Sequence, residues 1–301
     1  MKLVKQYVEL FEQGPGIDGM YNAIEDAARI CYKSSGRLGK EFVDKLIKKK
    51  HTAVLEHGTV YLSIPIGPSF KDDRFVEKYA LKHFFLHNQY SRGVQVSYYD
   101  EDSCPAEFKE MCDNWEGVNV CYITTSFRII LDNFKDVDEV LKYWSEPTKY
   151  HPKRISMKIV CDRINSQSFM RHRRFSFAQE STRYCNYNND KFDNEVSFVI
   201  PYWYKYGKGT NDRECSMDSE FENCCRDSEQ SYLRMIQWGA KPQEARQVLI
   251  NALKTEFIMT GFADDWKHFL DVRTTNTYGT PHPDMMDLAL MIKSKIQDKI
   301  Y

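Results

Sequence analysis

Basic side chains gather between residues 154 and 183, where seven lysines and arginines stand against two acidic residues in a chain of net charge -1. The densest part is the run Arg171-His172-Arg173-Arg174. Positive charges packed this closely repel one another unless an anion or a carboxylate offsets them. Because arginine grips phosphate through two parallel hydrogen bonds, this segment predicts a site for phosphorylated ligands.

Neutral hydrogen-bonding residues follow the basic run, namely Gln179, Ser181 and Tyr184, with Arg183 among them. In an extended stretch, Ser181 and Arg183 would point to the same side and offer a hydroxyl and a guanidinium to one ligand. No histidine-and-carboxylate relay adjoins Ser181 in the sequence, so we interpret its hydroxyl as a ligand donor rather than a nucleophile.

Two other interpretations of the basic run stay open. Consecutive basic residues are typical of a solvated surface patch. With the interleaved rings of Phe175 and Phe177, the patch from Arg171 to Arg174 could also stack and bind single-stranded nucleic acid.

Composition narrows the class of protein. The chain has 301 residues, of which 28% are charged and 14% aromatic, and its mean hydropathy is -0.60. This aromatic content excludes a disordered chain. No stretch approaches the roughly 20 apolar residues of a membrane helix, and the N-terminus lacks an apolar signal segment. We therefore expect a cytoplasmic protein that does not bind membranes.

The cysteines indicate neither disulfides nor a metal site. There are nine, and no two are spaced as Cys-x-x-Cys. An odd count without that spacing fits neither a disulfide framework nor a zinc site. We expect a reducing compartment and no bound metal.

Hydropathy patterns predict a mixture of strands and helices whose order does not repeat as strand, helix, strand. The expected strands cover 2–10, 59–64, 155–159, 196–200 and 255–260. The expected helices cover 18–31, capped by Asp18, then 42–50, 217–238, 242–252, 264–272, capped by Asp264, and 283–296. This order favours an α+β fold, with an antiparallel or mixed sheet flanked by helices, over a doubly wound sheet.

One domain is expected to span 1–301, with a long variable segment at about 66–150. That segment contains a possible helix over 74–88, a loop over 100–105 and an apolar stretch over 118–131, and the sequence leaves its topology open.

The run Arg171-His172-Arg173, followed by seven residues and then Ser181, resembles the Arg-His-Arg-x7-Ser signature of the flavin-dependent thymidylate synthases. Arg183 and Tyr184 also fit that signature. Further similarities follow the family's order and lie at 27–32, 56–59, 90–92, 122–125, 244–249 and 268–273.

The resemblance implies reductive methylation of dUMP to dTMP. Methylenetetrahydrofolate would supply the carbon, and NADPH would reduce FAD, which passes the hydride on. It also implies a homotetramer with shared active sites, no nucleic-acid partner and no need for an activated cysteine. A related flavoenzyme acting on another pyrimidine nucleotide is the alternative within the same family.

The resemblance also assigns residues by matching position. The expected FAD-binding residues are His57, Thr59, Arg171, His172, Arg173 and His268. The expected nucleotide-binding residues are Gln179, Ser181, Arg183, Arg246 and Arg273. Arg273 is also the expected catalytic residue, since it would stabilise negative charge on the uracil ring.

Four positions depart from the family pattern. Ala178 and Gln179 stand where Asn and Glu are common, Ser168 stands where Gln or Glu is usual, and Asp264 stands where a basic residue is common. These departures favour a possible change in substrate preference.

Overall fold

The computed structural model describes residues 1–66, 95–99, 119–206, 212–275, 277 and 279–300. The helix expected over 74–88 and the loop expected over 100–105 lie outside the described residues.

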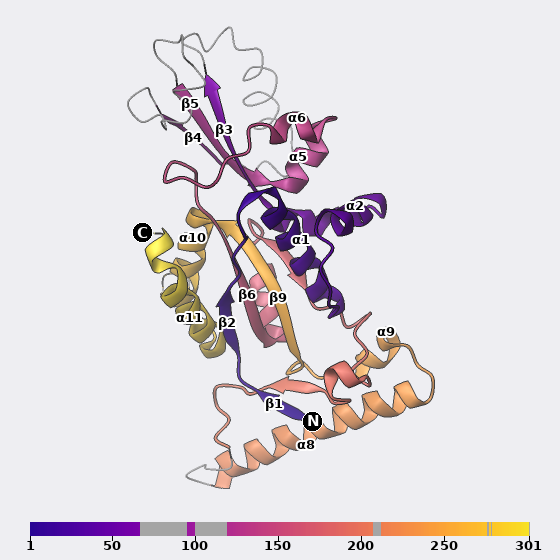
Figure 1. The fold of residues 1–301 in the computed structure, drawn as a ribbon. Coiled ribbons are helices and arrows are strands. Elements are labelled where there is room, and N and C mark those ends of the chain that lie inside the picture. The colour runs from indigo at the N-terminus through magenta and orange to yellow at the C-terminus, as the bar shows by residue number, and fades with distance from the viewer. Residues whose placement is uncertain (67–94, 100–118, 207–211, 276, 278, 301) are drawn as a thin grey trace.

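A four-stranded antiparallel sheet forms the centre of the molecule (Figure 1). Its strands lie in the order β2 (Tyr7–Leu10), β6 (Arg154–Asp162), β9 (Lys254–Phe262) and β7 (Ser176–Gln179). The expected strand over 255–260 is thus a nine-residue strand between two neighbours, whereas β7 lies at the edge.

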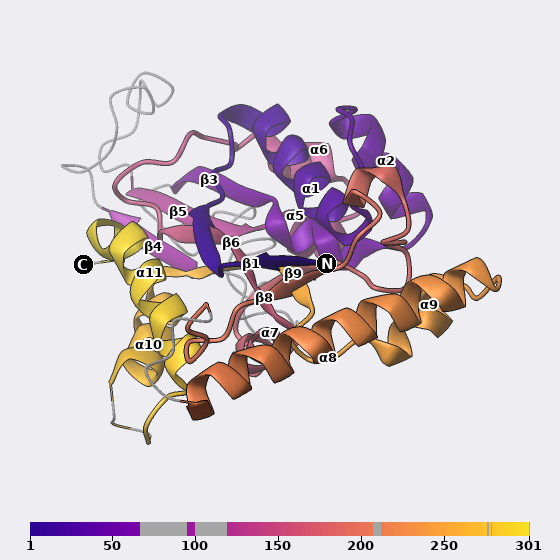
Figure 2. The same cartoon turned by 90° about the horizontal axis from the view of Figure 1, so that it is seen from below.

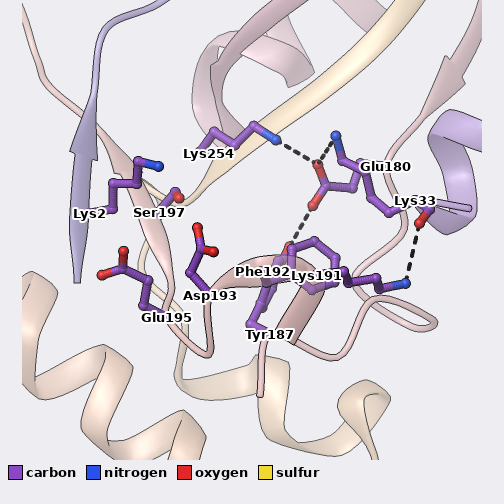
Figure 3. A pocket seen from close by; sticks show the side chains of 10 residues that line it. All are labelled: Lys2, Lys33, Glu180, Tyr187, Lys191, Phe192, Asp193, Glu195, Ser197 and Lys254. Carbon is purple, nitrogen blue, oxygen red and sulfur yellow. Dashed lines mark hydrogen bonds and ion pairs between the residues drawn. The ribbon is translucent and has the colours of Figure 1, made fainter. Parts of the chain in front are cut away.

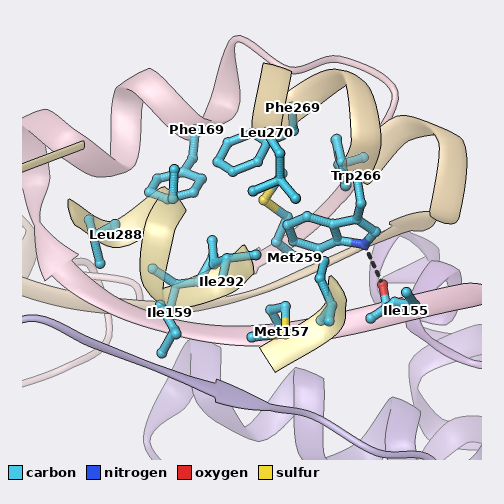
Figure 4. Packing of buried hydrophobic residues seen from close by; sticks show 14 of the residues in the cluster. Ile155, Met157, Ile159, Phe169, Met259, Trp266, Phe269, Leu270, Leu288 and Ile292 are labelled. Carbon is cyan, nitrogen blue, oxygen red and sulfur yellow. Dashed lines mark hydrogen bonds between the residues drawn. The ribbon is translucent and has the colours of Figure 1, made fainter. Parts of the chain in front are cut away.

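One face of this sheet is covered by α7 (Arg163–Met170), α10 (Ala263–Thr274) and α11 (Pro283–Ile300). Alternate side chains of β6 and β9 point into this layer and pack on the helices (Figure 4). The indole N–H of Trp266 donates to the carbonyl of Ile155 at 3.1 Å, so the largest buried side chain is also hydrogen-bonded.

The opposite face of the sheet meets α1 (Gly16–Tyr32) and the short helix η1 (Thr52–His57). Ala27 of α1 packs against Ala178 of β7 and Ile258 of β9. The helix expected over 42–50 is confirmed as α2 (Lys40–Lys48). The edge strand β7 is therefore held between helices on both faces.

A second antiparallel sheet has the order β3 (Thr59–Ile66), β5 (Asn119–Ser126) and β4 (Gln95–Tyr99). The apolar stretch expected over 118–131 supplies β5 and the start of α5 (Phe127–Asn133), and α6 (Val137–Leu141) follows. Val60, Leu62 and Ile64 alternate into the core, as the sequence predicts.

The third layer pairs β1 (Lys2–Val4) with β8 (Ser197–Val199) in parallel. The long helix α8 (Asp212–Gln237) runs beside this pair (Figure 2). After it come Gly239, in the left-handed conformation with φ 92°, then α9 (Pro242–Ala245) and η6 (Arg246–Val248). The short helix η5 (Asp190–Phe192) precedes β8.

The α+β class with antiparallel sheets and flanking helices is confirmed. The prediction of one strand over 2–10 is wrong. Residues 2–4 pair with β8, whereas residues 7–10 pair with β6. Between the two strands, the side chain of Gln6 donates to the carbonyl of Asp284 at 3.1 Å. The helix starting at Pro242 is shorter than predicted and ends as a 3-10 turn.

Both predicted helix caps are wrong. Pro15 precedes α1 and Phe262 precedes α10, so Asp18 and Asp264 lie inside the first turn of each helix. Acidic side chains there still favour the positive end of the helix dipole. Across the described segments, no helix is both long enough and apolar enough to cross a membrane.

Candidate active site

The predicted signature occupies both ends of the edge strand β7. The basic run from Arg171 to Arg174 follows the end of α7 and precedes this strand. A turn over 181–184 follows its other end. We call the first region the basic end and the second the 181–184 turn.

At the basic end, Arg171 and Arg173 are exposed, and neither has an ion-pair partner within the described residues. Arg174 instead lies 3.4 Å from the carboxylate of Asp265. Two guanidinium groups are therefore left to meet an external anion.

His172 and Arg273 form a hydrogen-bonded pair beside these arginines. Arg273 Nε donates to His172 Nε2 at 3.0 Å, and Arg273 Nη2 donates to the carbonyl of Ser168 at 3.1 Å. Burial, together with the charge of Arg273, lowers the pKa of His172 to about 4, so the ring is neutral at pH 7. Because Nε2 accepts a bond, the ring proton lies on Nδ1, which can donate to a ligand.

His268 is exposed on α10 and contributes to the lowered pKa of His172. The structure thus brings together Arg171, His172 and His268, as predicted for the cofactor, and adds Arg273 to them. Arg273 lies at this end of β7, whereas the other predicted nucleotide residues gather elsewhere in the same chain.

His57 and Thr59 do not join this group. His57 is 1% exposed, and its Nδ1 lies 2.8 Å from the hydroxyl of Thr260. Burial lowers the pKa of His57 to about 3. Thr59 is 5% exposed and accepts a bond from Arg154 at 3.0 Å. Both are interior residues in this chain, and their contact with FAD stays a prediction.

The 181–184 turn is closed by its own backbone. The N–H groups of Tyr184 and Cys185 donate to the carbonyl of Ser181 at 3.1 and 3.0 Å. The N–H of Arg183 lies 3.3 Å from the hydroxyl of Ser181. The expectation of an extended stretch is therefore wrong. A turn, not strand alternation, brings the Ser181 hydroxyl to the backbone N–H of Arg183, while the guanidinium lies over the Tyr184 ring.

Arg246 reaches this turn from η6, where its Nη1 donates to the hydroxyl of Thr182 at 3.2 Å. Gln179, at the end of β7, donates to the hydroxyl of Thr255 at 3.2 Å. Arg183 is exposed, with its guanidinium carbon 5.2 Å from the centre of the Tyr184 ring. The structure thus gathers the predicted nucleotide residues other than Arg273.

Sequence reasoning missed a buried carboxylate beside the turn. Glu180 is 2% exposed and accepts from Tyr187 at 2.9 Å and from Lys254 at 3.0 Å (Figure 3). Glu180, Lys254 and Lys33 line a cavity of about 270 Å³. The one signal in the sequence was an acidic residue inside a basic motif.

The stacking surface that nucleic-acid binding would need is absent at Phe175. This ring is 8% exposed and packs edge-on against Trp266, with centroids 4.7 Å apart. A base has no access to a face that the core already covers.

The fold and the site together define an antiparallel α+β protein that carries signature arginines at both ends of one edge strand. The chain belongs to the family described as thymidylate synthase complementing protein, whose family model matches residues 121–300, more than half of the chain.

Curated relatives agree with this family. The flavin-dependent thymidylate synthase of Thermococcus onnurineus is 30% identical over 113 residues, which cover 38% of this chain and 42% of that protein. The enzyme of the same name from Pyrococcus furiosus is 29% identical over 152 residues, covering 50% and 59%. That from Thermococcus kodakarensis is 29% identical over 165 residues, covering 54% and 60%. The matches span about half the length of these relatives.

Among solved structures, the chain is similar to a UMP/dUMP methylase, PolB, from Streptomyces cacaoi, bound with 5-Br dUMP. The TM-score is 0.40 at 20% identity, and the match covers 48% of this chain and 66% of that one.

Proposed function

We propose that this protein converts dUMP to dTMP by reductive methylation, with methylenetetrahydrofolate as the carbon donor and NADPH as the source of the hydride that FAD transfers. Membership of the family supports the reaction class. The observation that carries the proposal is the pair of arginine sets at the two ends of β7, one for each phosphorylated ligand.

The basic end fits FAD. Its exposed arginines, Arg171 and Arg173, would bind the diphosphate, and His172 would donate from Nδ1 to the flavin ring. Bound FAD would supply the hydride chemistry that no side chain offers. The arginines' part is to favour negative charge near the reduced ring.

The 181–184 turn fits the nucleotide. Arg183 is exposed for a bidentate bond to phosphate, and its backbone N–H lies 3.3 Å from the hydroxyl of Ser181. Arg246 is already oriented toward the turn by Thr182. Gln179 would complete the contacts to the pyrimidine.

Two of the buried thiols are unsuited to a cysteine route. Burial raises the pKa of Cys185 to about 11 and that of Cys225 to about 12. A thiol with such a pKa is not a nucleophile at neutral pH. Both groups therefore act as small core side chains.

We also propose that the active sites are completed between copies in a homotetramer. Arg273 lies with His172 at the basic end, whereas Arg183 lies beyond the other end of β7. For Arg273 to stabilise charge on a uracil ring held by Arg183, the two must come from different copies. His57 and Thr59, which are buried, would then support the cofactor site from the protein interior.

The test is to purify the protein, record its flavin spectrum, and supply dUMP with methylenetetrahydrofolate and NADPH. Bound FAD and formation of dTMP are expected. A colourless protein that takes up no FAD on titration would overturn the proposal.

The same assay identifies the pyrimidine. Because Ala178 and Gln179 depart from the family pattern, dUMP and dCMP should be supplied side by side while flavin reoxidation is followed. Faster reoxidation with dCMP would move the proposal to another pyrimidine nucleotide.

A further inference from the structure

A side-chain bond closes the base of the 181–184 turn. Glu180 precedes the turn and Tyr187 follows it, and the Tyr187 hydroxyl donates to Glu180 Oε1 at 2.9 Å. Both side chains are buried, at 2% and 5% exposure. Burial raises the pKa of Tyr187 well above its ordinary value, so the phenol remains a donor across the physiological range.

The second oxygen of Glu180 is held by lysines from two distant elements. Lys254 lies at the start of β9, and its Nζ is 3.0 Å from Glu180 and 3.3 Å from Glu256. Lys33, just after α1, pairs with Glu256 and lies 3.9 Å from Glu180. Burial alone would lower the pKa of Lys254, but Glu180 and Glu256 outweigh it and raise the pKa.

Backbone bonds tie the same elements to the turn. The N–H of Ser181 donates to the carbonyl of Cys31 near the end of α1 at 3.0 Å, and the N–H of Glu180 donates to the carbonyl of Glu256 at 2.9 Å. Lys33 has φ 49°, a left-handed conformation that directs the chain away from the helix. The turn is thus fixed on both sides before any ligand arrives.

We propose that Glu180 and Tyr187 are positioning residues that hold the 181–184 turn in the shape that binds the nucleotide phosphate. This inference rests on the proposed function, because it takes the turn to be the nucleotide site. The carboxylate touches no ligand itself. It fixes the positions of Ser181 and Arg183, so that binding the nucleotide costs little further conformational entropy.

The molecule offers a matched control. Tyr204 is buried like Tyr187, at 8% exposure, and its hydroxyl donates to Glu222 at 2.5 Å, away from the turn. Tyr187→Phe and Tyr204→Phe each remove one phenol-to-carboxylate bond. Because Glu222 is more exposed than Glu180, Tyr204→Phe should lower the melting temperature no more than Tyr187→Phe does, and only Tyr187→Phe should affect the turn.

The experiment measures dUMP affinity by calorimetry, FAD retention by absorbance, and amide hydrogen exchange at Tyr184 and Cys185. Tyr187→Phe should weaken dUMP binding about fivefold to tenfold, leave FAD unchanged and speed exchange at both amides. Tyr204→Phe should change none of these by more than about twofold. Glu180→Gln, which keeps an acceptor for Tyr187, should fall between them.

Two outcomes separate the possible failures. If the unaltered protein binds no dUMP, the proposed function fails, while the exchange rates still decide whether Tyr187 orders the turn. If it binds dUMP and Tyr187→Phe matches Tyr204→Phe in affinity and exchange, the positioning role is overturned.

Discussion

The two ends of β7 carry the same kind of side chain but hold it differently. At the basic end, Arg174, which is 58% exposed, pairs with Asp265, and no described residue forms an ion pair with Arg171 or Arg173. At the other end, the turn rests on Glu180 and Lys254, which are buried and bound to several partners.

The difference shows how the two ends of one strand can form binding sites that are preorganised to different degrees. A ligand at the 181–184 turn would meet a shape already fixed by buried charges, at little further entropic cost. A ligand at the basic end would have to order exposed arginines on arrival. We expect the cofactor to draw its affinity from many contacts and the nucleotide from a few rigid ones.

The largest expected effect is on stability at the turn. Lys254→Met leaves Glu180 and Glu256 buried, with Lys33 as their remaining ion-pair partner among the described residues, so the free energy of unfolding should fall by roughly 3 kcal/mol. Urea denaturation measures the loss. Lys45→Met is the control, since both members of its pair with Glu41 at 2.6 Å are exposed. Equal losses in both variants would contradict the contrast between the ends.

The next effect concerns the ligands. Arg183→Ala should weaken dUMP binding by about 1.5–3 kcal/mol, because a hydrogen bond from a charged group to phosphate is lost, while FAD retention survives. Calorimetry with each ligand gives both values.

The reciprocal variant is Arg173→Ala, which should release FAD and retain dUMP. Equal loss of both ligands in either variant would show that the two ends do not act separately.

The third effect concerns the interior between the ends. The pKa of His57 is about 3 in the folded chain and about 6.5 when unfolded, so only the unfolded state gains this proton as pH falls through that range. The contribution of the neutral His57 ring to the free energy of unfolding is complete above pH 6.5. Below that pH, this contribution should decline by about 1.4 kcal/mol per pH unit. Urea midpoints between pH 8 and 4 measure this slope.

The control for that slope is His57→Gln. His172 and His151, each with a pKa of about 4, add to the slope in both proteins. The difference between the two slopes therefore isolates His57. A variant as steep as the original would mean that water already reaches this ring.

The smallest effect is expected at the basic end. Arg174→Met removes an exposed guanidinium from Asp265, so the free energy of unfolding should change by less than about 1 kcal/mol. Thermal unfolding at low and high salt would check this, since salt screens an exposed pair. A loss as large as that of Lys254→Met would remove the distinction drawn between the ends.

Elements with clear periodicity could be predicted from the sequence. Val60, Leu62 and Ile64 alternate into one core, and the helix beginning at Pro283 buries the face that its spacing indicates. Boundaries set by tertiary partners could not. Nothing local marks Gln6 as the point where the chain leaves one strand partner for another.

The site divides in the same way. The spacing of the signature predicted that Ser181 and Arg183 act together, and the structure shows how the predicted Arg246 reaches the same turn through Thr182. Glu180 was visible only as an acidic residue, because its partner Lys254 lies 74 positions away in the sequence. The contact between Glu180 and Lys254 depends on where the fold places β9, so the sequence around Glu180 contains no pattern that predicts it.

The lysine and glutamate network beside the turn also carries an evolutionary consequence. Lys33, Glu180, Lys254 and Glu256 share their charges, so the loss of either lysine leaves a buried carboxylate with fewer partners, and the loss of either glutamate leaves the two lysines to repel each other. Descendants of this chain should therefore exchange these four positions in compensating sets, whereas Cys31, which serves the turn through its main-chain oxygen, is constrained only by the packing of its side chain.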